Sequence, residues 1–417
     1  MQELIITFAT PVFFALIGVE WLVARRRGRP AYRANDAISS IGLGVISQVA
    51  GVFGKVLSIG IYAWFGAHLA PVTLPVDQVA VWVFALLAYD FLYYWLHRAG
   101  HEVNILWAAH VVHHQSEHYN LSTALRQTGS GMLLGWLFYL PMALAGVPTE
   151  VFVVVALIDL LYQFWVHTEQ IGRLGWFDRV FCSPSNHRAH HAVNARYLDR
   201  NYGGILIVWD RLFGTFVEED DTDPPVYGTR APLRSWNPLW ANAEVYWAAA
   251  RDMWHARRWR DKARVWLKPP GWRPADVAAR FPRPAFDIHR ERFDPPMPRA
   301  LTLYCLVQFA LMLGMATQFL ALSATAGLPT LLGYAAYLVA SLTALGALME
   351  GRRGVRRIEA ARVLATAVLP WASGRWFGIA HLDGRLALAL LLVFGLSALA
   401  LPWLDRPSAQ ALPVTPH

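Results

Sequence analysis

The sequence predicts an all-α, polytopic integral membrane protein in which clustered histidines lie at one membrane face. Three observations predict this fold class. Apolar residues make up 55% of the 417-residue chain, and they gather in runs close to the roughly 20 residues that a membrane-spanning helix needs. Arginines follow several of these runs, as is typical of loops on the cytoplasmic side. Histidines recur at helical spacing directly beside apolar runs.

The first 75 residues are expected to form N-terminal transmembrane helices. The apolar run 4–23 precedes five arginines, at positions 25–33, that the positive-inside rule places in the cytoplasm. No basic region precedes this run and no small-residue cleavage site follows it, so we expect a retained span rather than a signal peptide. The run 38–65 is followed by a loop without Lys or Arg up to Asp77, as expected of an outer loop.

Residues 76–220 are expected to form a core that carries three histidine motifs. The run 79–96 returns inward and ends in aromatic residues at the interfacial level, so the histidines after it emerge on the cytoplasmic side. The runs 131–147 and 151–166 are expected to form a hairpin of two spans that leads back to the same face at His167.

The remainder divides into a polar and an apolar part. Residues 221–299, rich in Arg, Trp and Pro, are expected to form a cytoplasmic segment, and residues 300–417 a C-terminal transmembrane accessory block. Four arginines between positions 352 and 357 again mark a cytoplasmic loop. The apolar runs of the accessory block are 300–322, 328–348, 360–371 and 386–404. Together with the earlier runs they make nine expected spans.

Charge and cysteine content exclude further classes. The net charge of +8 is typical of nucleic-acid binding, but the arginines flank apolar runs and the sequence has no RNA- or DNA-binding motif. Cys182 and Cys305 cannot build a disulfide framework or a CxxC metal site. The short loops and the lack of a recognisable organelle address favour a bacterial inner membrane, with the endoplasmic reticulum membrane as the alternative.

Eight histidines fall into three groups at helical spacing. The first group stands at i, i+4 and the other two at i, i+3, i+4, so the rings of each group can aim at a common point. The groups are His97 and His101; His110, His113 and His114; and His187, His190 and His191. Eight imidazoles are too many for one ion, so their number favours a di-metal site at the cytoplasmic membrane face, while imidazole alone leaves zinc, copper, iron and nickel open. Packing is a poor alternative, because burying so many titratable rings is costly.

Four further residues near these motifs are candidates. His167 could join the site as a ninth ligand, the alternative being an interfacial polar cap. Asp90 is a carboxylate within a span, about two helical turns before His97, and we expect it to orient that ring. Asp159 stands in the same relation to His167. Asn120, which closes the histidine-rich stretch, is included as a candidate catalytic residue.

The ordered pattern HxxxH, HxxHH, HxxHH lies within three longer stretches. They are YDFLYYWLHRAGHEVNILWAAHVVHHQSEHYNLSTALRQ, LLYQFWVHTEQIGRLGW and PSNHRAHHAVNARYLDRNYGGILIVWDRLFGTF. Over about Ala88 to Phe216 the chain resembles the fatty acid hydroxylase and sterol desaturase superfamily and, within it, the alkylglycerol monooxygenase family. The resemblance implies that residues 76–220 are a hydroxylase-like catalytic core and that the histidines bind two iron ions, or lie close to them, for the activation of O2.

The resemblance also points to Glu102, directly after the second motif histidine. It implies a metal ligand or an acceptor that fixes a ring's tautomer, the alternative being a solvated ion pair. The implied reaction is hydroxylation of the carbon next to the ether oxygen of an alkylglycerol, which gives a fatty aldehyde and a glycerol. The electrons would come from tetrahydrobiopterin or from a protein electron donor.

Independent reasoning from the residues agrees with oxygen chemistry at a lipid. The ExxH motif of ferritin-like carboxylate sites does not occur in this sequence, and a hydrolytic zinc site needs only three protein ligands. Three alternatives stay open: a sterol, carotenoid or fatty acyl hydroxylase or desaturase; a metal or proton transporter; and an inactive lipid-binding scaffold. The sequence leaves the oligomeric state undetermined.

Overall fold

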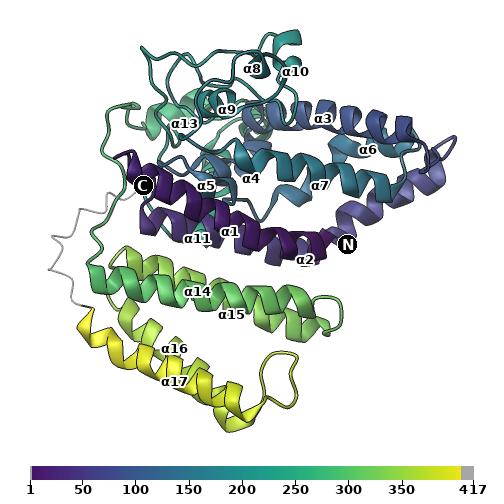
Figure 1. Ribbon diagram of the computed structural model, residues 1–417. Coiled ribbons are helices and arrows are strands. Elements are labelled where there is room, and N and C mark those ends of the chain that lie inside the picture. Colours follow the sequence, from purple (N-terminus) through teal and green to yellow (C-terminus); the bar gives the residue numbers. More distant parts are fainter. Residues whose placement is uncertain (1, 405–417) are drawn as a thin grey trace. The chain divides into compact units, whose positions relative to one another are not determined.

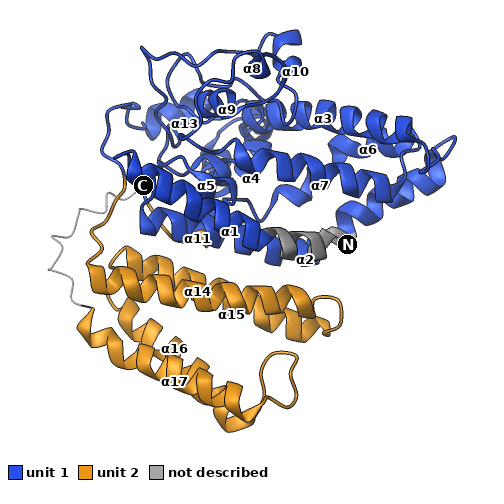
Figure 2. Cartoon of the chain, in the orientation of Figure 1, with its two compact units in different colours: residues 1–234, 240–292 blue, residues 235–239, 293–417 orange. Residues whose placement is uncertain are grey.

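The computed structural model describes residues 2–404, apart from the side chains of residues 2–9, 55 and 56. Within that range the elements are helices, and extended segments pair only through isolated bridges (Figure 1). This confirms the expected all-α fold class. The chain divides into two compact units (Figure 2): unit 1, residues 1–234 with 240–292, and unit 2, residues 235–239 with 293–417.

Five helices of the described chain are long and apolar enough to cross a membrane, in agreement with a multi-pass membrane protein. They are Ala34–Gly54 of α2 (Ala34–Leu69), α3 (Val79–Glu102), α14 (Arg299–Leu322), α15 (Leu328–Met349) and Gly384–Trp403, formed by α17 (Gly384–Ala400) with η2 (Leu401–Trp403).

Of the nine expected spans, the first, at 4–23, lies partly on residues whose side chains the structure does not describe, and three others, at 131–147, 151–166 and 360–371, are not among these five. The predicted hairpin of two spans contains a 3-10 turn, η1 (Gly131–Leu133), and the nine-residue helix α6 (Trp136–Leu144). Gly146 follows α6 in the left-handed region (φ 82°), where a Cβ atom would lie 2.1 Å from the Val72 carbonyl oxygen. The chain therefore turns early, and α7 (Thr149–Trp165) has only 17 residues.

The long helices of unit 1 form a bundle around aromatic residues. α3 packs against α6 and α7, and α2 packs against α6 (Figure 1). In the buried centre, Tyr89 stacks on Tyr139 with ring centroids 4.5 Å apart, and Tyr62 stacks on Phe152 at 4.1 Å. α1 (Gln2–Arg26) contacts α7 and α5 (Leu121–Ala124).

The histidine motifs lie at the end of α3 and on short helices beside it. α3 ends at Glu102, and the extended conformation of Val103 (φ −122°, ψ 118°) lets α4 (Asn104–His114) fold back against α3. α9 (Pro184–His190) begins with a proline in its first turn, and the Ser183 hydroxyl accepts from the Asn186 amide as an N-cap. The remaining helices in or entering unit 1 are α8 (Phe177–Val180), α10 (Val208–Leu212), α11 (Pro238–His255), α12 (Trp259–Leu267) and α13 (Ala275–Arg280).

Unit 2 contains α14, α15, α16 (Val355–Ser373) and α17, with α14 packed against α15 and α16 against α17. The weakly apolar run expected at 360–371 is the second part of α16. The first part of α16 carries Arg356, Arg357, Glu359 and Arg362.

Candidate metal centre

Nine histidine side chains of the described chain converge in two groups. Within each group the candidate ligand nitrogens all lie within 4.8 Å of one another. The first group is His97, His101, His110, His114 and His190, and the second is His113, His167, His187 and His191. The two groups adjoin, because the rings of His114 and His191 stack with centroids 4.3 Å apart.

Each HxxHH motif contributes to both groups. On α4, His110 and His114 belong to the first group while His113 belongs to the second. On α9 and at the residue that follows it the division is reversed. His187 and His191 belong to the second group, while His190 belongs to the first. Residues three and four apart lie on slightly different sides of a helix, so one motif can address two points. His97 and His101 on α3, and His167, two residues after the end of α7, complete the two sets.

Backbone carbonyls fix the orientation of four rings. The Nδ1 atoms of His97, His113 and His190 lie 2.8 to 2.9 Å from the carbonyl oxygens of Tyr202, Arg126 and Arg200. His167 Nδ1 lies 2.8 Å from the carbonyl oxygen of Gln163. A carbonyl only accepts, so each Nδ1 carries the proton and each Nε2 is left with a free lone pair.

These Nε2 lone pairs either face the Nε2 atom of another histidine or have no hydrogen-bond partner among the described residues. His167 Nε2 lies 3.1 Å from His113 Nε2, although neither atom carries a hydrogen in the tautomer that the carbonyls impose. His97, His101 and His190 each have a buried Nε2 without a hydrogen-bond partner in the described chain. Lone pairs that face one another repel unless a cation lies between them, so the donor set fits metal ions.

Burial favours the neutral form of the rings that metal binding requires. Loss of hydration is the largest cause that holds the pKa of six of these histidines below the usual value, and neighbouring rings or, for His113, nearby Arg126 add to the effect. For His113 the pKa is lowered to about 4. The pKa is well below the usual value for His110, His114, His187, His190 and His191.

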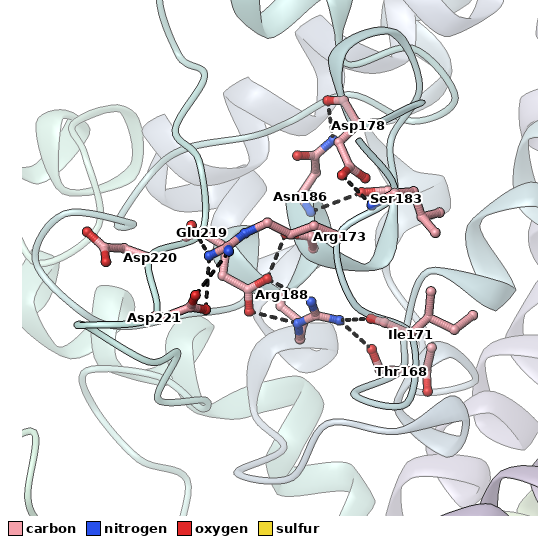
Figure 3. A network of polar contacts seen from close by, with 12 residues as sticks. Thr168, Ile171, Arg173, Asp178, Ser183, Asn186, Arg188, Glu219, Asp220 and Asp221 are labelled. Atoms are coloured by element: carbon pink, nitrogen blue, oxygen red, sulfur yellow. Dashed lines mark hydrogen bonds and ion pairs between the residues drawn. The ribbon is translucent and has the colours of Figure 1, made fainter. Parts of the chain in front are cut away.

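An arginine between two motif histidines holds α9 in place. The Arg188 guanidinium donates through Nε and Nη2 to the two carboxylate oxygens of Glu219, at 2.8 and 2.7 Å. Its Nη1 donates to the carbonyl oxygens of Thr168 and Ile171, at 2.9 and 2.7 Å. Figure 3 shows Arg188 between these partners. Since Thr168 follows His167, Arg188 joins two of the segments that supply the second group.

Asp90 has a different set of partners from the one expected. Among residues 2–404 its carboxylate accepts from the Ile205 and Leu206 amides and from Trp209 Nε1, at 2.6 to 3.1 Å, and from no histidine ring. Asp90 therefore fixes the segment that follows Tyr202, whose carbonyl accepts from His97. The expected effect on a ring is thus indirect.

Asp159 also lies apart from the ring that we expected it to orient. Its carboxylate accepts from Gln163 Nε2 at 2.5 Å, and Gln163 supplies the carbonyl to which His167 donates. A Cβ atom at Gly204 would lie 2.7 Å from Asp159 Oδ1 and 3.0 Å from Asp90 Oδ1. Only glycine fits between the two carboxylates.

Glu102 and Asn120 lie outside both histidine groups. Glu102 is 45% exposed and accepts from Arg98 Nε at 2.9 Å, which agrees with the alternative of a solvated ion pair. Asn120 is buried and caps α5, accepting from the Ser122 amide at 3.0 Å and donating to the Ala31 carbonyl at 2.8 Å. Its observed contacts are those of a helix cap.

Three residues near the groups had no sequence signal. Arg126 is fully buried and donates to the Val112 carbonyl at 2.7 Å while its own carbonyl accepts from His113. The Tyr202 ring lies 5.4 Å from that of His101, and its buried hydroxyl has no partner among described residues. Asp210 accepts from the amides of Tyr202 and Gly203 at 2.8 and 2.7 Å.

Comparison with known proteins supports the resemblance seen in the motifs. The fatty acid hydroxylase family matches residues 82–215, and the alkylglycerol monooxygenase C-terminal domain matches residues 301–373. The human alkylglycerol monooxygenase is 36% identical over 364 residues, which cover 87% of this chain and 81% of that protein. The zebrafish (Danio rerio) protein of the same name is 37% identical over 373 residues, with the same coverage.

Other relatives match a smaller part of the chain. An ornithine lipid hydroxylase of Rhizobium tropici is 31% identical over 139 residues, which cover 32% of this chain and 41% of that protein. No solved structure matches the chain. Since relatives above 30% identity cover most of its length and both domain families match, the chain belongs to the alkylglycerol monooxygenase family.

Proposed function

We propose that this protein is a membrane-bound di-iron monooxygenase that hydroxylates a lipid with O2. The observation that carries the proposal is the pair of adjoining histidine groups, whose neutral rings turn free Nε2 lone pairs towards one another. Imidazole suits iron among other metals, and two groups suit two ions. Membership in a family of lipid monooxygenases supports iron over the other metals.

The first histidine group would hold one iron ion and the second group the other. A bound pair of irons would supply the activation of O2 and the insertion of one oxygen atom into a C–H bond. The chain's own residues keep the rings ready for this. The carbonyls of Tyr202, Arg126, Arg200 and Gln163 hold protons on Nδ1, so each Nε2 stays available as a donor.

The substrate class we propose is an alkylglycerol, the class in the name of the relatives that cover most of the chain. One atom of O2 would enter the C–H bond next to the ether oxygen, and the other would leave as water after uptake of two electrons and two protons. The resulting hemiacetal would break at its C–O bond to give a fatty aldehyde and a glycerol. Tetrahydrobiopterin or a protein electron donor would supply the two electrons.

A second candidate keeps the centre and changes the lipid. The ornithine lipid hydroxylase and a fungal fatty acid hydroxylase match only 32% of the chain. Their similarity supports a core that can serve different lipids, including the sterols, carotenoids and fatty acyl chains considered above. A transporter is less well supported, because the nine rings gather in one place rather than along a path through the spans.

Arginine positions support a cytoplasmic location of the histidine centre. Arg25 and Arg26 end α1, and Arg352 and Arg353 follow α15, as the positive-inside rule expects of cytoplasmic loops. We propose a bacterial inner membrane, with the endoplasmic reticulum membrane as the alternative.

The decisive experiment combines metal analysis with a substrate assay on detergent-purified protein. Mass spectrometry of the wild type should give about two irons per chain, and a His113→Ala, His190→Ala double variant should lose them. Iron-loaded wild type, given O2 and reductant, should release fatty aldehyde from an alkylglycerol. Release of a hydroxylated ornithine or sterol lipid instead would favour the second candidate. Wild type that stays metal-free after incubation with ferrous iron would contradict the di-iron proposal.

A further inference from the structure

One face of α11 presents tryptophans to the exterior. Trp240, Trp247 and Trp254 recur at seven-residue intervals, so they lie on one side of the helix. Their exposed fractions rise along the helix from 36% to 62% and 79%. Ala241 and Ala249, on other sides of the helix, are buried. An exposed apolar stripe of this kind is typical of a surface that contacts a membrane or another protein.

The turn from α11 to α12 adds positive charge beside this stripe. Arg257, Arg258 and Arg260 are exposed, and their guanidinium groups have no hydrogen-bonding or ion-pair partner within residues 2–404. Between them stands Trp259, which is 84% exposed. Farther along α12 the pattern changes, since Arg264 pairs with Asp261 at 3.1 Å. Arginines without partners in the described range and exposed tryptophans therefore lie together at the turn between α11 and α12, a region that we call the corner.

Hydrogen bonds tie this part of the chain to the end of a membrane span. The Asn104 side chain donates to the Val265 carbonyl at 2.9 Å, and the Asn104 amide donates to the Lys268 carbonyl at 3.0 Å. Asn104 follows α3, whose 24 residues span about 36 Å, more than the ~30 Å hydrocarbon core. The end of α12 therefore lies close to the depth of the lipid headgroups.

We propose that this corner is a membrane-surface contact that binds anionic lipids. It consists of Trp247, Trp254, Arg257, Arg258, Trp259 and Arg260. The indoles enter the interfacial layer, where Trp is favoured, and the arginines bind lipid phosphates. Free arginines complement an anionic surface, and the headgroup depth of the far end of α12, about 9 Å of helix from Trp259, favours a bilayer over a soluble protein. Because α12 packs on α4, this contact holds a histidine-bearing helix at a fixed depth.

The test uses spin labels on the full-length protein in lipid nanodiscs. Trp254→Cys and Trp259→Cys are labelled, with Glu218→Cys as the matched exposed and polar control. The wild type, treated with the same spin label, shows whether the native Cys182 and Cys305 are labelled; both are buried. The ratio of accessibility to oxygen over a water-soluble nickel complex should be at least ~2-fold higher at positions 254 and 259 than at 218.

A change in lipid charge tests the phosphate-binding role of the arginines separately from the insertion of the tryptophans. The ratio at position 254 should rise when phosphatidylglycerol is added to phosphatidylcholine discs. An Arg257→Gln, Arg258→Gln, Arg260→Gln triple variant should remove that rise. Labels as water-exposed as the control in both lipids would overturn the proposal. Labels shielded from both reagents would overturn it in favour of a protein contact, and an unchanged rise in the triple variant would overturn the role of the arginines.

Discussion

Two regions of this protein bury polar side chains in opposite ways. In unit 2, Glu359 accepts from the Tyr304 hydroxyl at 2.7 Å and from Arg362 Nε and Nη2 at 2.8 and 2.7 Å. Arg362 Nη2 also donates to Gln308 Oε1 at 2.6 Å, and Gln308 Nε2 donates to the Ser397 hydroxyl at 2.8 Å. Apart from Arg362 Nη1, these groups satisfy one another across α14, α16 and α17.

In the histidine centre of unit 1, hydrogen bonds satisfy only the ring nitrogens that point away from the centre. Backbone carbonyls take the Nδ1 protons of four rings, while inward nitrogens face each other or have no partner in the described chain. A network that closes on itself joins helices, whereas a cluster that leaves lone pairs open is arranged around a ligand. The two regions should therefore respond differently to substitution.

The largest expected effect comes from removing one ring of either histidine group. His190→Ala should weaken the first group and His187→Ala the second, and each should lower activity by more than the 10- to 100-fold typical of an outer-shell change. Iron content and aldehyde release check this, with the exposed His289→Ala as control. If each variant loses only one iron, the division into groups of five and four is supported. Full iron and activity in either variant would contradict it.

Among changes at the metal centre, Arg188→Lys should have the next largest effect, and it should act on the second group. A lysine ammonium cannot hold both Glu219 oxygens and two carbonyls at once, so α9 would lose its link to the segment after His167. We expect iron affinity to fall about 10- to 100-fold, measured as iron retained against a chelator.

Figure 3 offers a control for this substitution in Arg173, whose guanidinium lies 3.0 Å from the carboxylate of exposed Asp221 and donates to the backbone carbonyl, not the carboxylate, of Glu219 at 2.7 Å. Arg173→Lys should leave iron retention unchanged, because an exposed pair contributes about 1 kcal/mol or less. Equal losses in both variants would show that Arg188 has no special link to the centre.

In unit 2, substitution should reduce stability and spare the metal. Glu359→Gln removes the charge that Arg362 faces inside the helix bundle, and breaking one side of a buried pair costs about 3–5 kcal/mol. The thermal transition of the purified protein should fall while iron per chain stays constant. Loss of iron at a temperature where the variant is folded would contradict the contrast between the two regions.

The sequence predicted the components of the centre better than their arrangement. HxxxH and HxxHH spacing suffices to collect rings on helix faces, and the return of the chain at His167 suggested a ninth. Spacing could not divide the rings into five and four, because that depends on how α4 and α9 face each other. A sequence motif indicates only which residues lie on the same face of one helix, not how two helices face each other.

The direct contacts expected of Asp90 and Glu102 with the rings are absent from the described chain for a related reason. Asp90 was placed near His97 by counting turns, yet its partners are amides more than 100 residues later in the chain. Glu102 follows a motif histidine but points to Arg98 on its own helix. Backbone carbonyls do most of the orienting, and every residue type carries one, so composition gives no signal for them.

The smallest predicted effect is a pH dependence confined to the metal-free centre. Burial lowers the pKa of His113 to about 4, while the unfolded chain has the ordinary value near 6.5. Between these values the unfolded state binds the extra proton, so stability falls as the pH drops below about 6.5. His113 alone should cost about 1 kcal/mol between pH 7 and pH 5.5.

Thermal unfolding of chelator-treated protein at these two pH values measures this cost. His113→Gln, which cannot titrate, should show a smaller pH-dependent loss than the wild type, since the other buried rings still respond. Iron-loaded protein at pH 5.5 should instead lose iron, because protons and metal compete for the same nitrogens. A metal-free wild type with equal stability at both pH values would mean that the rings are already hydrated when the ions are absent.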